Sequence, residues 1–292
     1  MMIAAVLIIA GLFLTAAFWH GLVTRKYTVK SDKIKGRVKL VLVSDLHSRI
    51  YGRNQKNIAS KIKKARPDII LLGGDIYDML GSTPLKGAEQ FLDAVKNIAP
   101  VYYVTGNHDM VLMRLRKPNL KKSIAARGIS VLDNKYAALD INGNRIIIGG
   151  VDDPGANRKG DSAEYQRRLE RRWEKRVSYY FEKLENDGAF KILLSHRPEK
   201  TGIYGSLPFD LILSGHAHGG QWRIPFILNG FFAPHQGFFP KYAGGLYKYN
   251  GKTHIVSRGA SVHLDMPRIF NPPEIVVISL LGIANKARQG LS

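Results

Sequence analysis

The sequence predicts an α/β fold in which polar loops follow the strands of a sheet. Six short apolar segments have the character of buried strands, and each runs directly into a polar or glycine-containing cluster. These segments cover residues 38–43, 68–72, 101–104, 145–148, 191–194 and 210–213. Helical stretches lie between the early ones, for example residues 54–66 and 87–97. Alternation of strand, polar loop and helix is typical of α/β proteins, which carry functional loops at the ends of their strands.

The composition limits the classes of protein to which this chain can belong. Its 292 residues carry 44 Lys and Arg against 23 Asp and Glu, which gives a formal net charge of +21. Such an excess favours polyanionic partners, whether nucleic acid, anionic lipid or phosphorylated substrate. The chain has no cysteine, so disulfides, thiolate metal ligands and cysteine nucleophiles are excluded. A chain of this length buries a full core, as one large domain or as one domain with an appendage.

The amino-terminal segment is strongly apolar. Residues 1–24 contain no Asp, Glu, Lys or Arg, and about 20 apolar residues in a helix are enough to cross a bilayer. We therefore expect residues 1–24 to form a transmembrane helix. A cleaved signal peptide is the first alternative, but it would need a basic start and small residues where this chain has Phe18 and Trp19. A buried core helix is the second alternative.

The expected domain organisation follows from this segment. Residues 25–37 are expected to form a short basic linker, and residues 38–292 to form one folded domain. Basic residues such as Arg25 and Lys26 follow the apolar segment and none precedes it, so the positive-inside rule favours a cytoplasmic domain. We accordingly expect a single-pass protein of the cell membrane with its folded domain in the cytoplasm.

Two further stretches each allow two interpretations. Residues 162–186 have apolar side chains at helical spacing and many arginines on the other faces, which is typical of a surface helix with one stripe on the core. Docking of its basic face to lipid headgroups or phosphate is the alternative. Residues 222–242 hold five phenylalanines among prolines and glycines, which favours an irregular cover over the core edge. An aromatic loop that dips into a membrane is the alternative there.

Seven residues of metal-ligand type directly follow predicted strands. They are Asp45, His47, Asp75, Asn107, His196, His216 and His218. Any one of them has a structural explanation, such as a turn or a helix cap, but the whole set at strand ends favours a site. Oxygen and imidazole donors without sulfur suit Mn, Fe or Zn, and a carboxylate such as Asp75 can bridge two cations. Two cations about 3.5–4 Å apart stabilise both oxygens of an in-line phosphoryl displacement.

Five motifs, in order along the chain, resemble those of the calcineurin-like metallophosphoesterases. They are Asp45-Leu46-His47, Gly74-Asp75-Ile76-Tyr77-Asp78, Gly106-Asn107-His108-Asp109, the single His196 and Gly215-His216-Ala217-His218. The stretches at residues 219–225, 257–259 and 273–275 resemble a bacterial, membrane-tethered subgroup with one amino-terminal hydrophobic segment. The resemblance implies a four-layer α/β/β/α sandwich with a dinuclear metal site at the strand ends, tethered by one helix.

The resemblance also implies roles for individual residues. The first ion would be held by Asp45, His47, Asp75 and His218, and the second by Asp75, Asn107, His196 and His216. The implied cofactors are two divalent ions, Mn, Fe or Zn, and the implied chemistry is hydrolysis of a phosphoester or phosphoanhydride by metal-bound hydroxide. His108 would protonate the leaving oxygen or stabilise charge on the phosphoryl group, and Asp109 would orient His108. The residues that match no motif role are Asp78, Asp152, Asp153, His235, His254 and His263.

The expected substrate is an anionic phospholipid or a phosphorylated small molecule at the membrane surface. The basic composition, the apolar amino terminus and the aromatic loop together support this class. Some members of the tethered subgroup cleave the pyrophosphate of UDP-diacylglucosamine, which is the specific candidate. The alternative is a basic nucleic-acid-binding protein or nuclease, although the sequence carries no helix-turn-helix, zinc-finger or RNP signature. The sequence does not indicate the oligomeric state.

Overall fold

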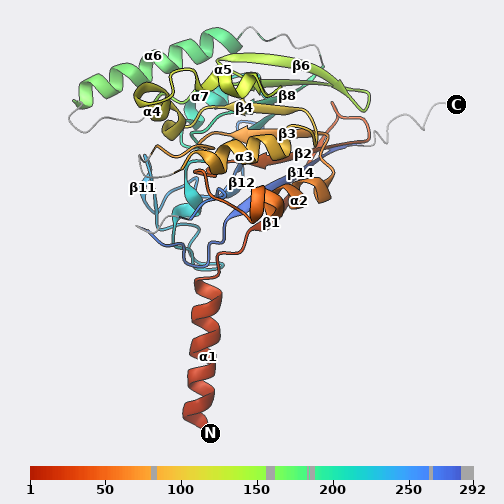
Figure 1. Cartoon of the computed structure of the whole chain (residues 1–292). Helices are drawn as coiled ribbons and strands as arrows, with labels where there is room; N and C mark the ends of the chain where they lie inside the picture. The colour runs from red at the N-terminus through yellow and green to blue at the C-terminus, as the bar shows by residue number, and fades with distance from the viewer. Residues whose placement is uncertain (80–83, 156–161, 183, 185–187, 263–265, 284–292) are drawn as a thin grey trace, which may run out of the picture.

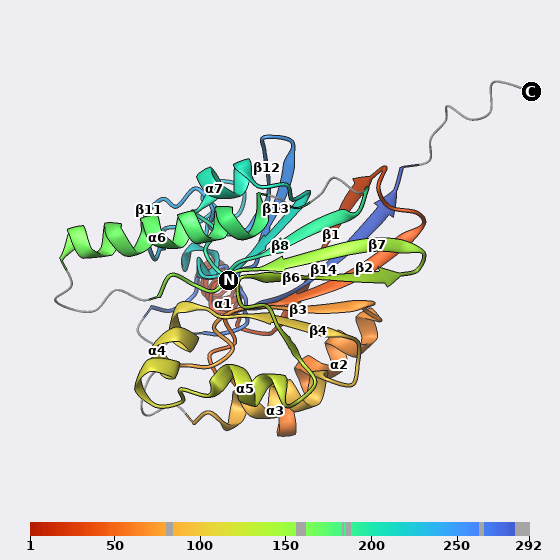
Figure 2. The ribbon, with the colours of Figure 1, turned by 90° about the horizontal axis from the view of Figure 1, so that it is seen from above.

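Two six-stranded mixed sheets pack face to face, and helices cover the outer face of each sheet (Figures 1 and 2). The structure is a computed structural model that describes residues 1–79, 84–155, 162–182, 184, 188–262 and 266–283. In strand order, the first sheet contains β1 (Val23–Ser31), β14 (Glu274–Gly282), β2 (Arg37–Val43), β3 (Ile69–Gly73), β4 (Val101–Val104) and β5 (Ser130–Val131). The second contains β12 (Gly245–Tyr249), β13 (Lys252–Val256), β9 (Leu211–Ser214), β8 (Phe190–Leu194), β7 (Asn144–Gly150) and β6 (Lys135–Ile141).

The central strands of both sheets run parallel. β2 pairs with β3 and β3 with β4 in the first sheet, and β7 pairs with β8 and β8 with β9 in the second. Every residue of β3 and β9 is buried, because both faces of each sheet are covered. Burial on both faces explains why the sequence showed continuous apolar runs rather than alternation. Parallel strands end at the same edge of a sheet, so the loops that follow them collect there.

Three apolar clusters hold the chain in four layers. The central cluster lies between the sheets and includes Leu71 of the first sheet and Ile192 of the second. A second cluster lies between the first sheet and its helices, and a third between the second sheet and its helices. The layer order is therefore α/β/β/α, as the family resemblance implied.

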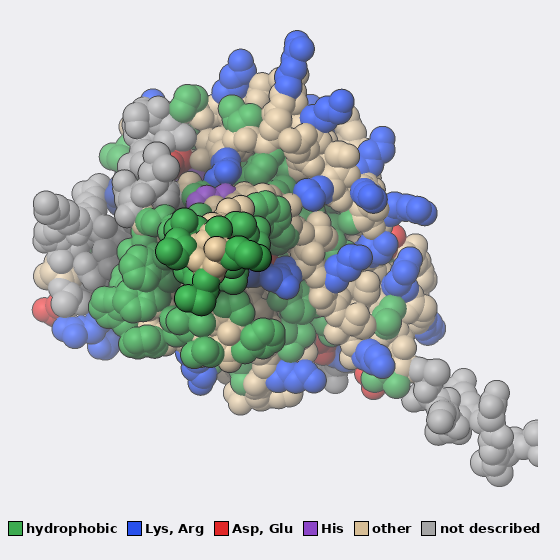
Figure 3. Space-filling view, turned by 90° about the horizontal axis from the view of Figure 1, so that it is seen from below, with side chains coloured by type: hydrophobic (Ala, Val, Ile, Leu, Met, Phe, Trp, Pro, Cys, Tyr) green, Lys and Arg blue, Asp and Glu red, His purple; other side chains and the backbone are tan. Residues whose placement is uncertain are grey.

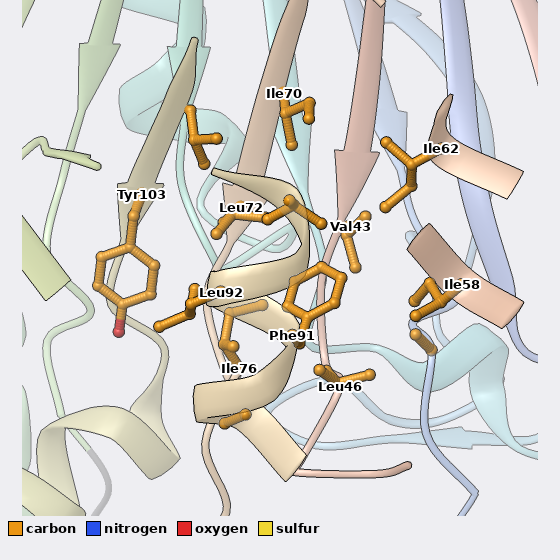
Figure 4. Close-up of a cluster of buried hydrophobic side chains, with 14 of the residues drawn as sticks. Val43, Leu46, Ile58, Ile62, Ile70, Leu72, Ile76, Phe91, Leu92 and Tyr103 are labelled. Carbon is orange, nitrogen blue, oxygen red and sulfur yellow. The ribbon is translucent and has the colours of Figure 1, made fainter. Parts of the chain in front are cut away.

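The first sheet is covered by α2 (Lys56–Ala65) and α3 (Lys86–Val95). Phe91 of α3 is completely buried and belongs to the same cluster as Ile58 and Leu72 (Figure 4). The apolar positions of both helices recur every three or four residues, so each helix presents one stripe to the sheet. These two helices lie where the sequence predicted helical stretches.

The second sheet is covered by α6 (Ala163–Phe181) and α7 (Thr201–Ser206). Trp173, Val177 and Phe181 form the buried stripe of α6, while its arginines are exposed. This arrangement agrees with the interpretation of a surface helix with one stripe on the core. Residues 183, 185 and 186 of the expected helix lie outside the described residues. In Figure 1, α6 lies at the end of the molecule opposite α1 (Met2–Ala17).

The amino-terminal segment differs from the sequence-based expectation. The helix α1 ends at Ala17 after 16 residues and projects from the sandwich with most of its side chains exposed (Figure 1). Among the described residues, no helix has both the length and the apolar character needed to cross a bilayer. The expected transmembrane helix over residues 1–24 is therefore not supported. The helix ends at Ala17, and the chain enters strand β1 at Val23.

The segment expected to be a basic linker, residues 25–37, contains most of β1. This strand pairs in parallel with β14, from Val23 opposite Glu274 to Ser31 opposite Gly282. Its sequence looked like a linker because β1 lies at the edge of the sheet, where exposed Lys and Arg side chains are tolerated and discourage pairing with other chains. The register with a strand near the carboxyl terminus is a tertiary feature that local sequence does not encode.

The aromatic stretch at residues 222–242 is irregular apart from a short pair of strands, β10 (Phe232–Ala233) and β11 (Gly237–Phe238). Ala233 is buried, so part of the stretch covers the core edge as expected. Phe226 and Phe238 of the same stretch are exposed to solvent. The stretch therefore has both a core-facing side and an unusual exposed aromatic side.

We predict that Phe91→Ala will lower the free energy of unfolding by about 3–5 kcal/mol, because it opens a cavity in a fully buried cluster. Tyr136→Ala, at a half-exposed position of β6, is the matched control and should change it by less than about 0.5 kcal/mol. Urea unfolding followed by circular dichroism measures both values. Equal effects of the two substitutions would contradict the packing described for α3.

Candidate metal centre

The predicted ligands come together where strands of both sheets end. Asp45 and His47 follow β2, Asp75 follows β3, and Asn107 begins α4 (Asn107–Leu115) shortly after β4. From the second sheet, His196 follows β8, and His216 and His218 follow β9. All seven side chains are buried, with at most 8% of each residue exposed. Face-to-face packing of the sheets thus brings residues far apart in sequence to one buried point.

The ligands form two adjoining clusters. Asp45, His47 and His218 have candidate ligand atoms within 4.8 Å of one another, and the same holds for Asp75, His196 and His216. Asp75 lies between the clusters, because its Oδ2 is 3.2 Å from His196 Nε2 and 3.7 Å from His47 Nε2. Its position is that of a carboxylate able to bridge two cations.

The loops that carry the ligands have an uncommon backbone conformation. Five ligand residues have positive φ, namely Asp45 (50°), His47 (46°), Asp75 (51°), His216 (65°) and His218 (47°). The left-handed conformation costs a non-glycine residue about 1–2 kcal/mol and persists where the surroundings enforce it. Each loop turns sharply after its strand, so that alternate side chains reach the same point. Such strain concentrated on metal-ligand types is typical of a functional site.

Two glycines allow the loops to approach one another. A Cβ atom on Gly106 would lie 2.1 Å from Asp75 Oδ1, and one on Gly215 would lie 2.4 Å from Asp45 Oδ2. Both distances are shorter than any contact between a real Cβ atom and an oxygen. The backbone N–H of His216 instead donates to Asp45 at 3.0 Å, and that of His108 donates to Asp75 at 2.8 Å. These glycines therefore make room for the carboxylates and their backbone donors.

The electrostatic potential of the centre favours positive charge. Burial alone would lower the pKa of His196, but Asp75 and Asp45 raise it to about 10. Burial alone would raise the pKa of Asp75, but His196 and His108 bring it well below its usual range. The carboxylates thus attract a proton to His196, while burial and the charge of Arg197 hold the pKa of His216 well below its usual value. The same potential favours the binding of divalent cations, because each of them carries more positive charge than a proton does.

The donor set fits two divalent cations. Carboxylate and imidazole donors without sulfur suit Mn, Fe or Zn. The Oδ1 atom of Asn107 is buried and, within the described part of the chain, accepts no hydrogen bond. A buried oxygen without a partner costs about 1–3 kcal/mol, which coordination to a hard cation would offset. Asn107 therefore has the geometry of a ligand and not of a residue in a plain turn.

His108 lies at the edge of the centre, with 17% of its side chain exposed. Its Nδ1 is 3.0 Å from Asp78 Oδ1, a residue to which the sequence assigned no role. Burial alone would lower the pKa of His108, but Asp75 and Asp78 raise it above its usual value. Asp78 lies three residues after Asp75 within one of the quoted motifs, and this spacing could have identified it.

Asp109, which we expected to orient His108, makes its hydrogen bonds in the described part of the chain to backbone groups. The Asp109 carboxylate accepts hydrogen bonds from the backbone N–H groups of Asp75 at 2.7 Å, Gly106 at 2.9 Å and Tyr77 at 3.1 Å. Asp109 lies in the first turn of α4, where an acidic side chain folds back toward free backbone donors. Its role is to join the loop after β3 to the loop after β4.

His235 reaches the centre from the aromatic stretch. Its Nδ1 lies 2.9 Å from Nε2 of His216. No motif surrounds His235, and its strand pair comes close to β9 only in the folded chain. We find no signal in the sequence that could have placed it here.

A fold of this kind with buried clusters of Asp and His defines a metal-dependent phosphoesterase, a class of hydrolase. The chain belongs to the calcineurin-like phosphoesterase family, whose family model matches residues 38–220. It is 26% identical over 289 residues to the uncharacterized protein YpbG of Bacillus subtilis (strain 168), covering 96% of this chain and 97% of that protein. It is also 26% identical to phosphodiesterase YaeI of Escherichia coli (strain K12), covering 90% of this chain and 89% of YaeI.

We predict that Gly106→Ala will weaken Mn²⁺ binding by about tenfold or more, because the added methyl group displaces Asp75. Gly202→Ala in α7 is the control, since no atom lies within 4 Å of its added methyl group. Calorimetric titration with Mn²⁺ measures both affinities. Unchanged affinity in Gly106→Ala would show that Asp75 is not held as described.

We predict that Asp78→Asn will lower kcat on an aryl phosphodiester by about 10–100-fold while the bound metal stays at the wild-type level. The physical reason is loss of the charge that orients His108 and raises its pKa. Metal analysis and steady-state kinetics on the same preparation test both parts. Loss of metal together with activity would instead make Asp78 a ligand.

Proposed function

We propose that this protein hydrolyses phosphodiester or phosphoanhydride bonds of an anionic amphiphile at a membrane surface. The observation that carries the hydrolytic part is the bridging position of Asp75 between two buried clusters of ligands. Two bound divalent cations would activate a water and neutralise the phosphoryl oxygens. The chain's own contribution is to fix the ligands, exclude bulk water and supply a proton at the rim.

His108 is the proton donor in this proposal. Its Nδ1 faces Asp78, which leaves Nε2 as the atom that acts on the leaving oxygen. Because Asp75 and Asp78 raise the pKa of His108, the imidazole carries a proton over a wider pH range than a solvated histidine does. The partial exposure of His108 allows a substrate to reach it from outside.

The substrate class rests on the surface beside the centre. Figure 3 shows apolar side chains gathered on one face of the molecule around α1. Phe226 and Phe238 of the aromatic stretch are also exposed. The relative YaeI carries the name phosphodiesterase, which supports diester chemistry. A lipid-linked pyrophosphate such as that of UDP-diacylglucosamine combines a hydrolysable bond with an apolar part, and it is the specific candidate.

We also propose the cytoplasmic face of the cell membrane as the site of action. Arg25, Lys26 and Lys30 lie in β1, the first strand after α1. Anionic lipids of the cytoplasmic leaflet attract such residues by about 1 kcal/mol each. This location places the catalytic centre next to lipid-linked phosphates.

We predict that the protein hydrolyses bis-p-nitrophenyl phosphate with Mn²⁺ and loses this activity with a chelator. Asp75→Asn should lower kcat/KM by at least about a hundredfold, because it removes the charge shared by both cations. Asp140→Asn, at an exposed position of β6, is the matched control and should have no effect. Hydrolysis that persists with the chelator or in Asp75→Asn would refute the dinuclear hydrolase. Preferential cleavage of plasmid DNA would favour a nuclease instead.

A further inference from the structure

An arginine-lined cavity of about 460 Å³ opens near the base of α1. Its wall includes Arg25 of β1, Arg223 and Arg258, together with Phe226 and Phe270. None of its lining residues belongs to the proposed ligand set of the metal centre. The cavity is therefore a separate feature that hydrolysis does not require.

The cavity carries more positive than negative charge. Arg258 donates through Nε to Glu274 at 2.6 Å, and Arg25 Nε lies 3.8 Å from the same carboxylate. Among the described residues, Arg223 donates to uncharged oxygens, namely the Gly219 carbonyl at 3.2 Å and Asn229 Oδ1 at 2.5 Å. Arg25 and Arg258 thus share the Glu274 carboxylate, and in the described part of the chain Arg223 has no ion pair and no acidic residue lines the cavity.

The side chains of Arg223 and Arg258 both lie beside Gly244. A methyl group on Gly244 would lie 2.5 Å from Arg258 Cγ and 3.5 Å from Arg223 Nη1, so the two arginine side chains are neighbours. Burial, and then the charge of Arg258, lower the pKa of Arg223 to about 10. Such mutual repulsion would be relieved by a phosphate, which two arginines can bind through paired hydrogen bonds.

The rim of the cavity is apolar and continuous with α1. Phe226 and Ile227 are fully or almost fully exposed, at 109% and 83% of their reference areas. Phe270 packs edge to face against Phe13 of α1, with ring centroids 5.2 Å apart. Figure 3 shows apolar side chains gathered around the end-on helix α1, with Lys and Arg side chains around them. An apolar surface beside a basic cavity matches the boundary between acyl chains and anionic headgroups.

We propose that this cavity binds the phosphate headgroup of an anionic phospholipid while α1 and the Phe226 loop insert into the same bilayer. The headgroup would lie between Arg223 and Arg258, and Arg25 would contact it from the exposed side. This inference rests on the proposed membrane location but not on the metal chemistry. The helix α6, whose arginines are exposed, lies at the end of the molecule opposite α1 (Figure 1) and would therefore be far from the bilayer.

The test is flotation of the full-length protein with vesicles of phosphatidylcholine, alone or mixed with phosphatidylglycerol. We predict that the wild type prefers the mixed vesicles and that Arg223→Gln lowers this preference about fivefold, since one interfacial arginine is lost. Arg172→Gln on α6 removes the same charge at the far end and should keep the preference.

Phe226→Ser should weaken binding to both kinds of vesicle. Metal content of each variant monitors the fold, and hydrolysis of an aryl phosphodiester by the wild type tests the proposed function separately.

Four outcomes would overturn the inference. Equal losses in Arg223→Gln and Arg172→Gln would mean general attraction by net charge. No preference for phosphatidylglycerol in the wild type would remove the headgroup site. Binding of inorganic phosphate that depends on Arg223, without any preference among vesicles, would assign the cavity to a free anion. A stable dimer that fails to bind vesicles would make the apolar face an interface between copies.

Discussion

The burial of two carboxylates within a sandwich of apolar sheets is the constraint on which the rest of the structure depends. Asp45 and Asp75 are almost completely removed from solvent, and an uncompensated buried charge is strongly destabilising. Backbone N–H groups of His216 and His108 compensate part of this charge, and neighbouring imidazoles compensate another part. The strained loops and close glycines are the means by which these donors come near enough.

The same constraint explains why the outer parts of the centre are built so tightly. Asp109 ties two ligand loops together through backbone donors, and Gly259 packs directly against Asp45. Asp78 and His235 surround the centre: Asp78 contacts His108, and His235 contacts His216. These surrounding residues hold the ligand side chains in position, so the geometry of the ligands does not depend on the cations alone.

The sequence predicted the α/β layers and the enzyme class well, because continuous apolar runs followed by Asp, Asn or His have a local signature. It did not predict β1, whose partner lies about 250 residues away, because an exposed edge strand has the composition of a linker. It also did not predict that His235 contacts His216, or that Asp78 contacts the His108 ring while Asp109 binds backbone groups. These contacts depend on how loops from different strands meet. From the sequence, we overestimated the length of α1, because apolar residues continue past Ala17, where the helix ends.

The insertion of β14 between β1 and β2 has a consequence for biosynthesis. During translation, α1 and β1 leave the ribosome long before the strand that β1 pairs with, so the first sheet cannot close until the last strand is made. Pairing over such a distance makes closure a late and slow step of folding. In the meantime the edge of β2 and the apolar helix are both uncovered, and a nearby lipid surface or chaperone would shield the nascent chain from aggregation.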